Sequence, residues 1–318
     1  MKNIYLNIYK PSLANLKKAK KNLENNNVVA IPTETVYGLS GNAYSNKSVE
    51  KIFKLKKRPF FNPLIIHFKN LKDLKNDVIL NINFKKLYKA FCPGPITFVL
   101  KKKKISKISK RATAGKKTVA VRIPKHKVIR NLLGILNFPL AAPSANISSR
   151  VSAVSKMDVI EEFGNKVKFI LDGGTSKFGL ESTIVSLINK PQILRLGCIE
   201  VNKIRKALKN KISLNKKSKN LIVPGQGKVH YSPGIKVRLN VQKPKLHEAF
   251  ILIKKRNFNG NNYFYLSKKN NLSEAGKNLY KTLRMIKKLK YKSIAVERIP
   301  NKGIGQTIND RLIRASKR

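Results

Sequence analysis

Acidic side chains are scarce in this chain. Its 318 residues include 15 Asp and Glu against 69 Lys and Arg, which gives a formal net charge of +54. Catalysis by a pair of carboxylates, one acting as acid and one as base, therefore has few candidates. We expect the chemistry of this chain to depend on cations, hydroxyl groups and backbone donors.

Cysteine pairs and the common metal and nucleotide motifs are also lacking. Cys92 and Cys198 are far apart and belong to no CxxC, which argues against a disulfide framework or a zinc site. The four histidines show no HExxH or comparable metal-ligand spacing. There is no GxxxxGK[ST] loop, no GxGxxG turn after a strand and no GxSxG elbow. A P-loop enzyme and a dinucleotide site are therefore not indicated.

Long apolar runs are missing too. No stretch approaches the roughly 18 apolar residues of a membrane span. The first residues, MKNIYLNIYKPSL, lack the continuous apolar region of a signal peptide, so we expect a cytoplasmic protein with no membrane partner. Hydrophobic residues still make up 42% of the chain, enough for sizeable cores, and this length favours two domains.

The positive charge has two interpretations. Clustered Lys and Arg displace counterions from phosphates, so a polyanion such as tRNA is one possible partner. A composition bias is the other, because Lys, Asn and Ile are abundant even where ordinary surface positions are expected. The charge is spread along the chain instead of being confined to one tail, and this favours the bias as the main cause.

Hydrophobic patterns predict a mixed α/β domain over residues 1–208. Expected strands lie at 28–31, 64–68, 96–101, 118–123, 140–142, 169–171, 182–187 and 193–196. Expected helices lie at 13–23, 48–56, 84–91, 127–136, 157–163 and 201–208. Several strands follow one another without a helix between them, which argues for a mixed twisted sheet over a strictly alternating parallel one.

A linker and a second domain are predicted after residue 208. The segment 209–236 is polar and then punctuated by Pro and Gly, which is typical of a linker. The remainder, 237–318, predicts a small Rossmann-like α/β accessory domain. Its expected strands lie at 250–253, 263–266 and 294–296, and its expected helices at 273–289 and 305–315.

Five polar segments lie at the ends of the expected elements. They are TET at 33–35, KKRP at 56–59 followed by Asn62 and His67, TVAVRIP at 118–124, AAPSANIS at 141–148, and EST at 181–183 with Arg195 one strand later. Each has an ordinary interpretation when taken alone: a self-capped turn, a solvated helix end, a core histidine, a Ser/Asn loop or a polar turn before a strand. The Ser/Asn loop could also form an anion-binding nest of backbone N–H groups.

Two arginines favour a bound anion. Arg58 precedes a proline, so we expect it to project from a fixed loop and not from mid-helix. Alternation places Arg122 with Thr118 and Ala120 on one face of a central strand, where a guanidinium needs an anion or a carboxylate. Because carboxylates are few, we favour a ligand as its partner. The planar fork of arginine suits phosphate or carboxylate.

The order of these segments resembles the YrdC-like family of threonylcarbamoyl-AMP synthases in its long, two-domain form. The matching motifs are PTETVYGL (32–39), KxRP (56–59), NPLxxH (62–67), PGPxT (93–97), VAVRIP (119–124), APSANxS (142–148), DGG (172–174), ESTIV (181–185) and ILRxG (193–197). They cover most of the first 200 residues. Further along, HYSP (230–233) resembles the linker motif of the family, and NDRLxRA (309–315) resembles the end of its accessory domain.

The resemblance implies an enzyme with a YrdC-like sheet and a concave basic cleft. Family members condense L-threonine, bicarbonate or CO2, and ATP into threonylcarbamoyl-AMP and diphosphate. A separate transfer complex then modifies adenosine 37 of tRNA. Mg²⁺ would accompany the ATP phosphates.

The resemblance also implies roles for individual residues. The residues that would hold L-threonine are Thr35, His67, Arg122, Ala142 and Ser182, with Arg122 on its carboxylate. Those that would hold ATP are Arg58, Asn62, Thr118, Ser144, Ser152, Arg195 and Tyr231. Lys56 and Arg58 would act electrostatically as the catalytic residues. No covalent nucleophile and no bound metal ligand is predicted.

Some positions depart from the family pattern. Ser149 stands where relatives often have Gly, and Val151 where many have Pro, so the loop at Ser152 is expected to differ in shape. The linker segment 224–229 also lacks the usual Met-Lys-Tyr-Arg run, which bears on how Tyr231 covers the nucleotide. One alternative function is a non-catalytic tRNA-binding module. Another is the carbamoyl transfer of hydrogenase-maturation proteins, although the acylphosphatase-like and zinc-finger modules of those proteins are not seen here.

Overall fold

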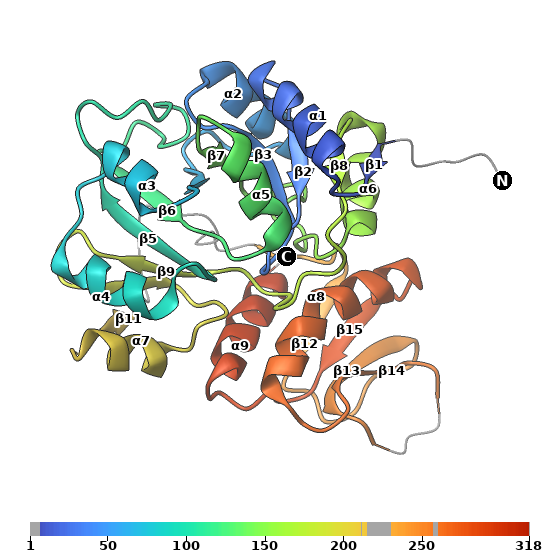
Figure 1. Cartoon of the computed structure of the whole chain (residues 1–318). Helices are drawn as coiled ribbons and strands as arrows, with labels where there is room; N and C mark the ends of the chain where they lie inside the picture. Colours follow the sequence, from blue (N-terminus) through green and yellow to red (C-terminus); the bar gives the residue numbers. More distant parts are fainter. Residues whose placement is uncertain (1–6, 211, 215–229, 257–259, 318) are drawn as a thin grey trace.

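A mixed sheet runs through the larger part of the molecule (Figure 1). The computed structural model describes residues 7–210, 212–214, 230–256 and 260–317. Among them the strands of this sheet follow the order β1-β8-β2-β3-β7-β4-β6-β5-β9-β10-β11. Their bounds are β1 Ile8–Tyr9, β2 Val29–Ile31, β3 Gly38–Asn42, β4 Ile65–His67, β5 Ile96–Lys101, β6 Thr118–Arg122, β7 Leu140–Ala141, β8 Ile170–Leu171, β9 Thr183–Ser186, β10 Gln192–Arg195 and β11 Ser213–Leu214. Parallel and antiparallel pairs are both present, so the predicted mixed sheet is confirmed.

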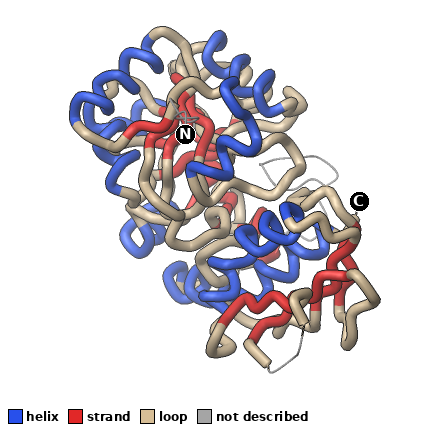
Figure 2. Tube along the Cα trace, turned by 90° about the vertical axis from the view of Figure 1, so that its right-hand side faces the viewer, coloured by secondary structure: helices blue, strands red, loops and turns tan. Residues whose placement is uncertain are grey.

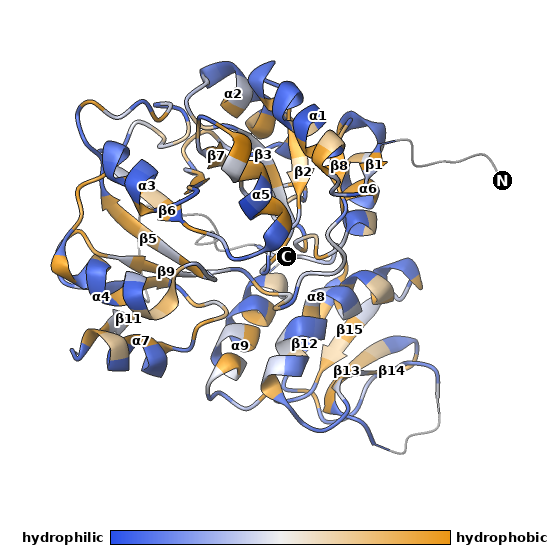
Figure 3. Ribbon diagram, in the orientation of Figure 1, coloured by the Kyte–Doolittle hydropathy of each residue, from blue (hydrophilic) through white to orange (hydrophobic). Residues whose placement is uncertain are grey.

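Helices cover both faces of this sheet. Their bounds are α1 Leu13–Glu24, α2 Asn46–Lys56, α3 Leu71–Asp77, α4 Ile82–Phe91, α5 Lys127–Ile135, α6 Lys156–Phe163 and α7 Val201–Leu208, with a 3₁₀ turn at Gly164–Lys166. The main core joins one face of the sheet to α2, α3, α4, α6 and α7. On the other face, α1 and α5 pack over β2 and β8. Hydrophobic residues are concentrated in the strands, and the outer surfaces of the helices are polar (Figure 3).

Near β4, β6, β5 and β9, the face of the sheet opposite the main core carries only a small hydrophobic cluster. Val121 belongs to the main core, whereas Ala120 belongs to a small cluster on the opposite face. His67 pairs in register with Arg122 on the parallel strands β4 and β6. Since residues two apart share a face, His67 and Arg122 lie on the side of this small cluster and away from the main core.

The C-terminal residues form a second, smaller α/β unit (Figure 2). Its parallel strands follow the order β12-β15-β13-β14. The bounds are β12 Lys236–Leu239, β13 Glu248–Lys254, β14 Tyr263–Ser267, α8 Leu272–Lys288, β15 Ser293–Val296 and α9 Ile304–Ala315. The predicted small α/β domain is therefore confirmed. The domain boundaries at 208 and 236 and the concave, positively charged cleft stay predictions.

The helices α8 and α9 face the larger domain and share a core with it. Val36, Val151 and Leu180 of the first domain belong to one hydrophobic cluster with Leu279 of α8 and Ile308 of α9. The two parts thus bury apolar surface together, which favours a fixed orientation over free domain motion.

Most expected helices and strands end within two residues of the observed ones, but several short elements were not predicted. They are β1, β3, β11, β12 and α3. In β3, Gly38 and Gly41 weaken the strand signal. Gly41 leaves no room for a side chain, because a Cβ there would lie 2.3 Å from Ser48 Oγ. In the described part of the chain, no helix combines the length and apolarity needed to cross a bilayer.

Candidate active site

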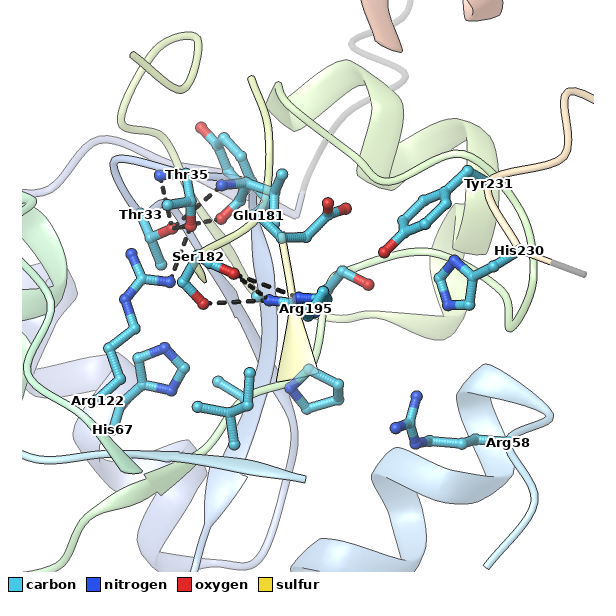
Figure 4. Close-up of a pocket in the computed structure, with 17 residues that line it drawn as sticks. Thr33, Thr35, Arg58, His67, Arg122, Glu181, Ser182, Arg195, His230 and Tyr231 are labelled. Carbon is cyan, nitrogen blue, oxygen red and sulfur yellow. Dashed lines mark hydrogen bonds between the residues drawn. The ribbon is translucent and has the colours of Figure 1, made fainter. Parts of the chain in front are cut away.

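A polar pocket lies on the second face of the sheet, at the ends of the central strands (Figure 4). It is lined by Thr33, Thr35, Val36, Tyr37, Gly38, Arg58, Ile65, His67, Arg122, Ala142, Pro143, Ser144, Glu181, Ser182, Arg195, His230 and Tyr231. Nine of the predicted site residues are among them: Thr35, Arg58, His67, Arg122, Ala142, Ser144, Ser182, Arg195 and Tyr231. The remaining predicted residues, Lys56, Asn62, Thr118 and Ser152, are not on the pocket wall.

Arg122 has a carboxylate partner within the chain, although the sequence favoured a ligand as its partner. Its Nη2 lies 2.7 Å from Glu34 Oε1, and its Nη1 donates to Thr35 Oγ1 at 2.9 Å. Its Nε donates to the carbonyl of Gly94. Glu34 reaches Arg122 because the loop after β2 folds over the end of β6. Each terminal nitrogen still has a second N–H, so the guanidinium can also bind a carboxylate.

Glu34 remains ionised although it is buried. Burial alone would raise the pKa of this carboxyl, but the charge of Arg122 and its hydrogen bond outweigh burial, so the pKa lies below its usual value. The second oxygen, Oε2, accepts from the backbone N–H of His126 at 3.2 Å. A carboxylate fixed in this way holds the plane of the Arg122 guanidinium.

The threonine hydroxyls next to Arg122 form a directed chain. Thr33 Oγ1 donates to the carbonyl of Val36 at 2.6 Å and lies 2.8 Å from Thr35 Oγ1. Since the Thr33 proton is used on Val36, the proton between the two hydroxyls belongs to Thr35. The loop is thus partly the self-capped turn considered above, and Thr35 also presents its hydroxyl oxygen to Arg122.

His67 faces the pocket as a neutral imidazole. It is 2% exposed, and its Nδ1 has no hydrogen-bond partner in the described part of the chain. Burial, together with the nearby charge of Arg122, lowers its pKa to about 3. An unpaired buried ring nitrogen is costly, which favours a ligand that bonds to it.

Ser182 and Arg195 form the next part of the wall. Arg195 donates from Nη2 to the Ser182 carbonyl at 2.8 Å and to Ser182 Oγ at 3.1 Å. Ser182 Oγ also lies 2.8 Å from Thr97 Oγ1. A shift in the strand register between Ile193 and Arg195 turns the arginine toward the pocket. A Cβ at Gly197 would lie 2.4 Å from the Ser182 carbonyl carbon, so this close approach requires glycine.

Arg58 is buried beside Arg195, and in the part of the chain that the structure describes none of its hydrogen-bond partners is a carboxylate. It donates to the Asn62 and Pro63 carbonyls at 3.0 and 2.9 Å and to Asn62 Oδ1 at 2.5 Å. Burial and the like charge of Arg195 lower its pKa to about 9. A guanidinium that is desolvated and repelled in this way is a suitable binding group for an anion.

The four predicted residues outside the pocket wall support it or lie apart from it. Lys56 is fully buried and donates from Nζ to the carbonyls of Ser144 and Asn146, at 2.6 and 2.5 Å. Burial holds its pKa well below the usual value. Asn62 orients Arg58, as described above. Thr118 begins β6 and is partly exposed.

Ser152 does not line the pocket, but it bonds to a carboxylate that does. Its hydroxyl donates to Glu181 Oε1 at 2.6 Å, and the residue is fully buried. Ser149, at the position where relatives often carry glycine, has a φ of 68°. The loop therefore keeps a left-handed residue there without a glycine, at a cost of about 1 kcal/mol. The contacts of Lys56, Asn62, Thr118 and Ser152 with ATP stay predictions.

Several residues of the site were not singled out from the sequence. Glu34, Thr97, Glu181 and His230 all bond within the site or line it. The scarcity of carboxylates could have identified Glu34 and Glu181, because a buried acid in such a basic chain must have a specific role. Thr97 belongs to the PGPxT motif, but its place in the site follows only from the strand pairing that brings β5 next to β9.

Tyr231 closes one side of the pocket (Figure 4). It is 1% exposed, and its hydroxyl has no hydrogen-bond partner among the described residues. The linker segment 224–229, on which its placement was expected to depend, lies outside the described residues. Three buried guanidinium groups, four Ser and Thr hydroxyl groups, the neutral imidazole of His67 and the phenol of Tyr231 thus line one pocket, which can bind anionic groups side by side.

Comparisons with known proteins cover nearly the whole chain. The Sua5–YciO–YrdC family model, described as telomere recombination, matches residues 21–197. A second model, described as the C-terminal domain of threonylcarbamoyl-AMP synthase, matches residues 199–317. The chain is 34% identical over 314 residues to the threonylcarbamoyl-AMP synthase of Pyrococcus abyssi, covering 91% of this chain and 90% of the relative. It is 32% identical over 317 residues to that of Bacillus subtilis, covering 92% and 90%.

Solved structures give the same result. The fold is similar to that of Pyrococcus abyssi Sua5 complexed with L-threonine, with a TM-score of 0.89, 31% identity, and coverage of 98% of this chain and 97% of the other. Escherichia coli YciO, at 20% identity and a TM-score of 0.56, covers 62% of this chain and 98% of its own length. The likeness to YciO shows the fold of the larger domain alone.

Proposed function

The chain belongs to the threonylcarbamoyl-AMP synthase family, and on this basis we propose that it is an L-threonylcarbamoyladenylate synthase. The enzyme condenses L-threonine, bicarbonate or CO2, and ATP into threonylcarbamoyl-AMP and diphosphate. The observation that carries the proposal is one pocket lined by three buried arginines, Arg122, Arg195 and Arg58, together with a neutral His67.

We assign L-threonine to the end of the pocket that contains Thr35, His67 and Arg122. Its carboxylate would use the free N–H groups of Arg122, and its hydroxyl and amine would meet Thr35 and the unpaired Nδ1 of His67. Ala142 and Ser182 complete this end. The small side chain of Ala142 leaves room for the substrate, because bulk there would fill the space beside Gly38.

We assign the nucleotide to the end that contains Arg58, Ser144, Arg195 and Tyr231. The phosphates would lie between Arg58 and Arg195, which lowers the repulsion between these two guanidinium groups. Asn62 supports this end by orienting Arg58, and Lys56 does so by tying the loop at Ser144. Direct ATP contacts of Thr118 and Ser152 remain part of the proposal.

The reaction needs no covalent intermediate with the protein. The threonine amine and CO2 give an N-carboxylate, whose oxygen attacks the α-phosphorus as the bond to the β-phosphate oxygen breaks. Diphosphate leaves, and the adenylate keeps the carbamate. The main difficulty is to bring two anions together, so we expect proximity and buried cations to supply most of the rate.

Magnesium would arrive with ATP. Within the described residues, no three His, Cys, Asp or Glu side chains are grouped so as to hold a metal ion. The ion would therefore be held by phosphate oxygens and water. Threonylcarbamoyl-AMP is a reactive product. We therefore also propose a transfer complex that passes its threonylcarbamoyl group to adenosine 37 of tRNA. The proposed location is the cytoplasm, where that tRNA is available.

Diphosphate release by the purified protein tests the function. We expect release from ATP and bicarbonate to depend on L-threonine and to yield a product with the mass of threonylcarbamoyl-AMP. L-serine and L-valine, which each lack one feature of threonine, serve as controls. Release that is independent of threonine, or the absence of release by folded protein, would contradict the proposal and favour an RNA-binding role.

A further inference from the structure

Glu181 is a buried carboxylate on the pocket wall that both domains hold. From the larger domain, Ser152 Oγ donates to its Oε1 at 2.6 Å. From α8, the hydroxyl of Tyr280 lies 3.0 and 2.8 Å from its two oxygens. From α9, Arg311 Nε donates to its Oε2 at 3.0 Å. The next residue, Ser182, is the one that bonds to Arg195.

The guanidinium of Arg311 contacts this wall from behind, on the side of the C-terminal domain. Its side chain is completely buried, and its Nη2 donates to the carbonyl of Leu196 at 2.6 Å. Leu196 follows Arg195 directly, so one arginine of the C-terminal domain fixes both strand ends that carry the Ser182–Arg195 pair. Burial would raise the pKa of Glu181, but the charges of Arg311 and Arg195 lower it to about 2, so the carboxylate stays charged.

The same guanidinium supports Tyr231. Its Cζ lies 4.7 Å from the centre of the Tyr231 ring. The Tyr231 ring also stacks on the ring of Tyr280, with the two ring centres 5.7 Å apart. Tyr231 has a φ of 61°, which is uncommon for an aromatic residue. The backbone on either side is tied down: Ser232 N–H donates to Ser149 at 2.9 Å, and His230 N–H to Arg314 at 3.4 Å. The strained loop is therefore fixed from both domains.

We propose that Arg311 and Tyr280 of the C-terminal domain are positioning residues for the nucleotide end of the pocket. They orient Glu181, the Ser182–Arg195 pair and the Tyr231 ring, and they touch neither substrate. The inference rests on the proposed function, because it uses the assignment of ATP to the Arg58–Arg195–Tyr231 end. The threonine end depends on them through Ser182 alone, because Arg122 is held by Glu34, Thr35 and Gly94 of the larger domain. Loss of Arg311 should therefore affect ATP more than L-threonine.

Steady-state kinetics of Arg311→Met separate this role from general destabilisation. We expect the KM for ATP to rise about 10-fold or more, with less than about a 3-fold change in the KM for L-threonine. Arg311→Lys keeps the charge near Glu181 but cannot also reach Leu196 and cover the ring, so an intermediate KM for ATP is expected. Equal changes in both KM values, or no change in either, would overturn the proposal.

Arg238→Met is the matched control. Arg238 pairs with the buried carboxylate of Glu248, 2.6 Å away, and both of its hydrogen bonds to Glu248 lie within the C-terminal domain. We expect it to lower the melting temperature without changing the ratio of the two KM values. If Arg311→Met fails to fold, Tyr280→Phe removes only the hydroxyl on Glu181 and should raise the KM for ATP by about 3-fold or more.

Direct binding distinguishes this inference from the proposed function. Calorimetric titration with a non-hydrolysable α,β-methylene analogue of ATP needs no turnover. If the wild-type protein binds the analogue but releases no diphosphate with threonine, the proposed function fails. The positioning role is then still tested by comparing analogue binding in Arg311→Met and the wild type. Analogue binding that is equally tight in Arg311→Met and the wild type would refute the positioning role even in an active enzyme.

Discussion

Arg58 is a buried cation next to another cation, and this arrangement costs free energy unless an anion is bound. Arg58→Ala removes the cation and leaves the buried oxygens of Asn62 and Pro63 without their donor. We expect kcat/KM for diphosphate release to fall by about 100-fold or more, because a preorganised charge at the reacting phosphate is lost. Arg111→Ala is the control, since Arg111 is half exposed and pairs with Glu50 away from the pocket. Undiminished turnover of the Arg58 variant would rule out catalysis by buried cations.

His67 should make the protein less stable in mild acid. The pKa of His67 is depressed to about 3, below the ordinary value of 6.5 that applies to the unfolded chain. Between those two values the unfolded chain binds a proton that the folded protein refuses. The contribution to stability is therefore complete above pH 6.5 and is lost as the pH falls from 6.5 toward 3.

Urea unfolding at pH 6.5 and 5.0 measures this effect. We expect His67 to account for a loss of about 1.5 kcal/mol over this interval, so His67→Gln should lose that much less than the wild type. Some pH dependence should persist in the variant, because burial also lowers the pKa of His126 and of His230. The same loss in both proteins would show that His67 is protonated in the folded state.

At the residue scale, the sequence predicted which side chains meet but not how each is held. Motif order was sufficient to place Thr35, His67, Arg122, Ser182 and Arg195 in one pocket. The pairing of Arg122 with Glu34 was not predicted, because the two are 88 positions apart and belong to different motifs. Because the chain contains few Asp and Glu residues, a ligand was favoured over a carboxylate as the partner of Arg122. A single well-placed carboxylate, that of Glu34, is sufficient to form the pair.

Among the helices and loops, the segment that carries Glu181 is fixed against α8 by a glycine. Gly179 has a φ of 64°, and a Cβ there would lie 2.3 Å from the backbone oxygen of Lys277. Gly179→Ala combines backbone strain with a clash that a side-chain rotation cannot relieve. We expect it to cost about 2–4 kcal/mol and to separate the melting of the two domains, measured by differential scanning calorimetry.

Gly115→Ala is the control for Gly179→Ala. Gly115 has a similar φ of 72°, but nothing lies within 4 Å of a Cβ placed there. It should show the cost of left-handed backbone alone, about 1 kcal/mol. If the two variants are equally destabilised, the loop does not press against α8 as the structure has it.

Element boundaries were predictable where apolar periodicity was long. The helix expected at 273–289 is observed as Leu272–Lys288, with Asn271 as its N-cap. Asn271 accepts from the N–H groups of both Ser273 and Glu274, a signal visible in the sequence. Two-residue strands such as β1 and β11 were not predicted, because they exist only through pairing, β1 with β8 and β11 with β10.

For the whole molecule, the charge of +54 should give strong but unselective binding to RNA. Most lysines are exposed and distributed over the helices of both domains. We expect affinities for tRNA and for an unrelated RNA of equal length to be similar, and both to fall steeply between about 50 and 200 mM salt. Filter binding at several salt concentrations measures this. Salt-resistant binding that prefers tRNA would instead indicate a dedicated RNA site.

The position of Arg311 in the chain has a consequence for folding during translation. It comes 130 positions after Glu181, the carboxylate that it neutralises. At the usual pace of translation, on the order of 10 s passes between the synthesis of the two. During that interval the nascent larger domain exposes an acid and an apolar face that later become buried. The enzyme should therefore acquire a competent nucleotide site only late in synthesis, and ribosomes stalled within the last helix would carry inactive chains.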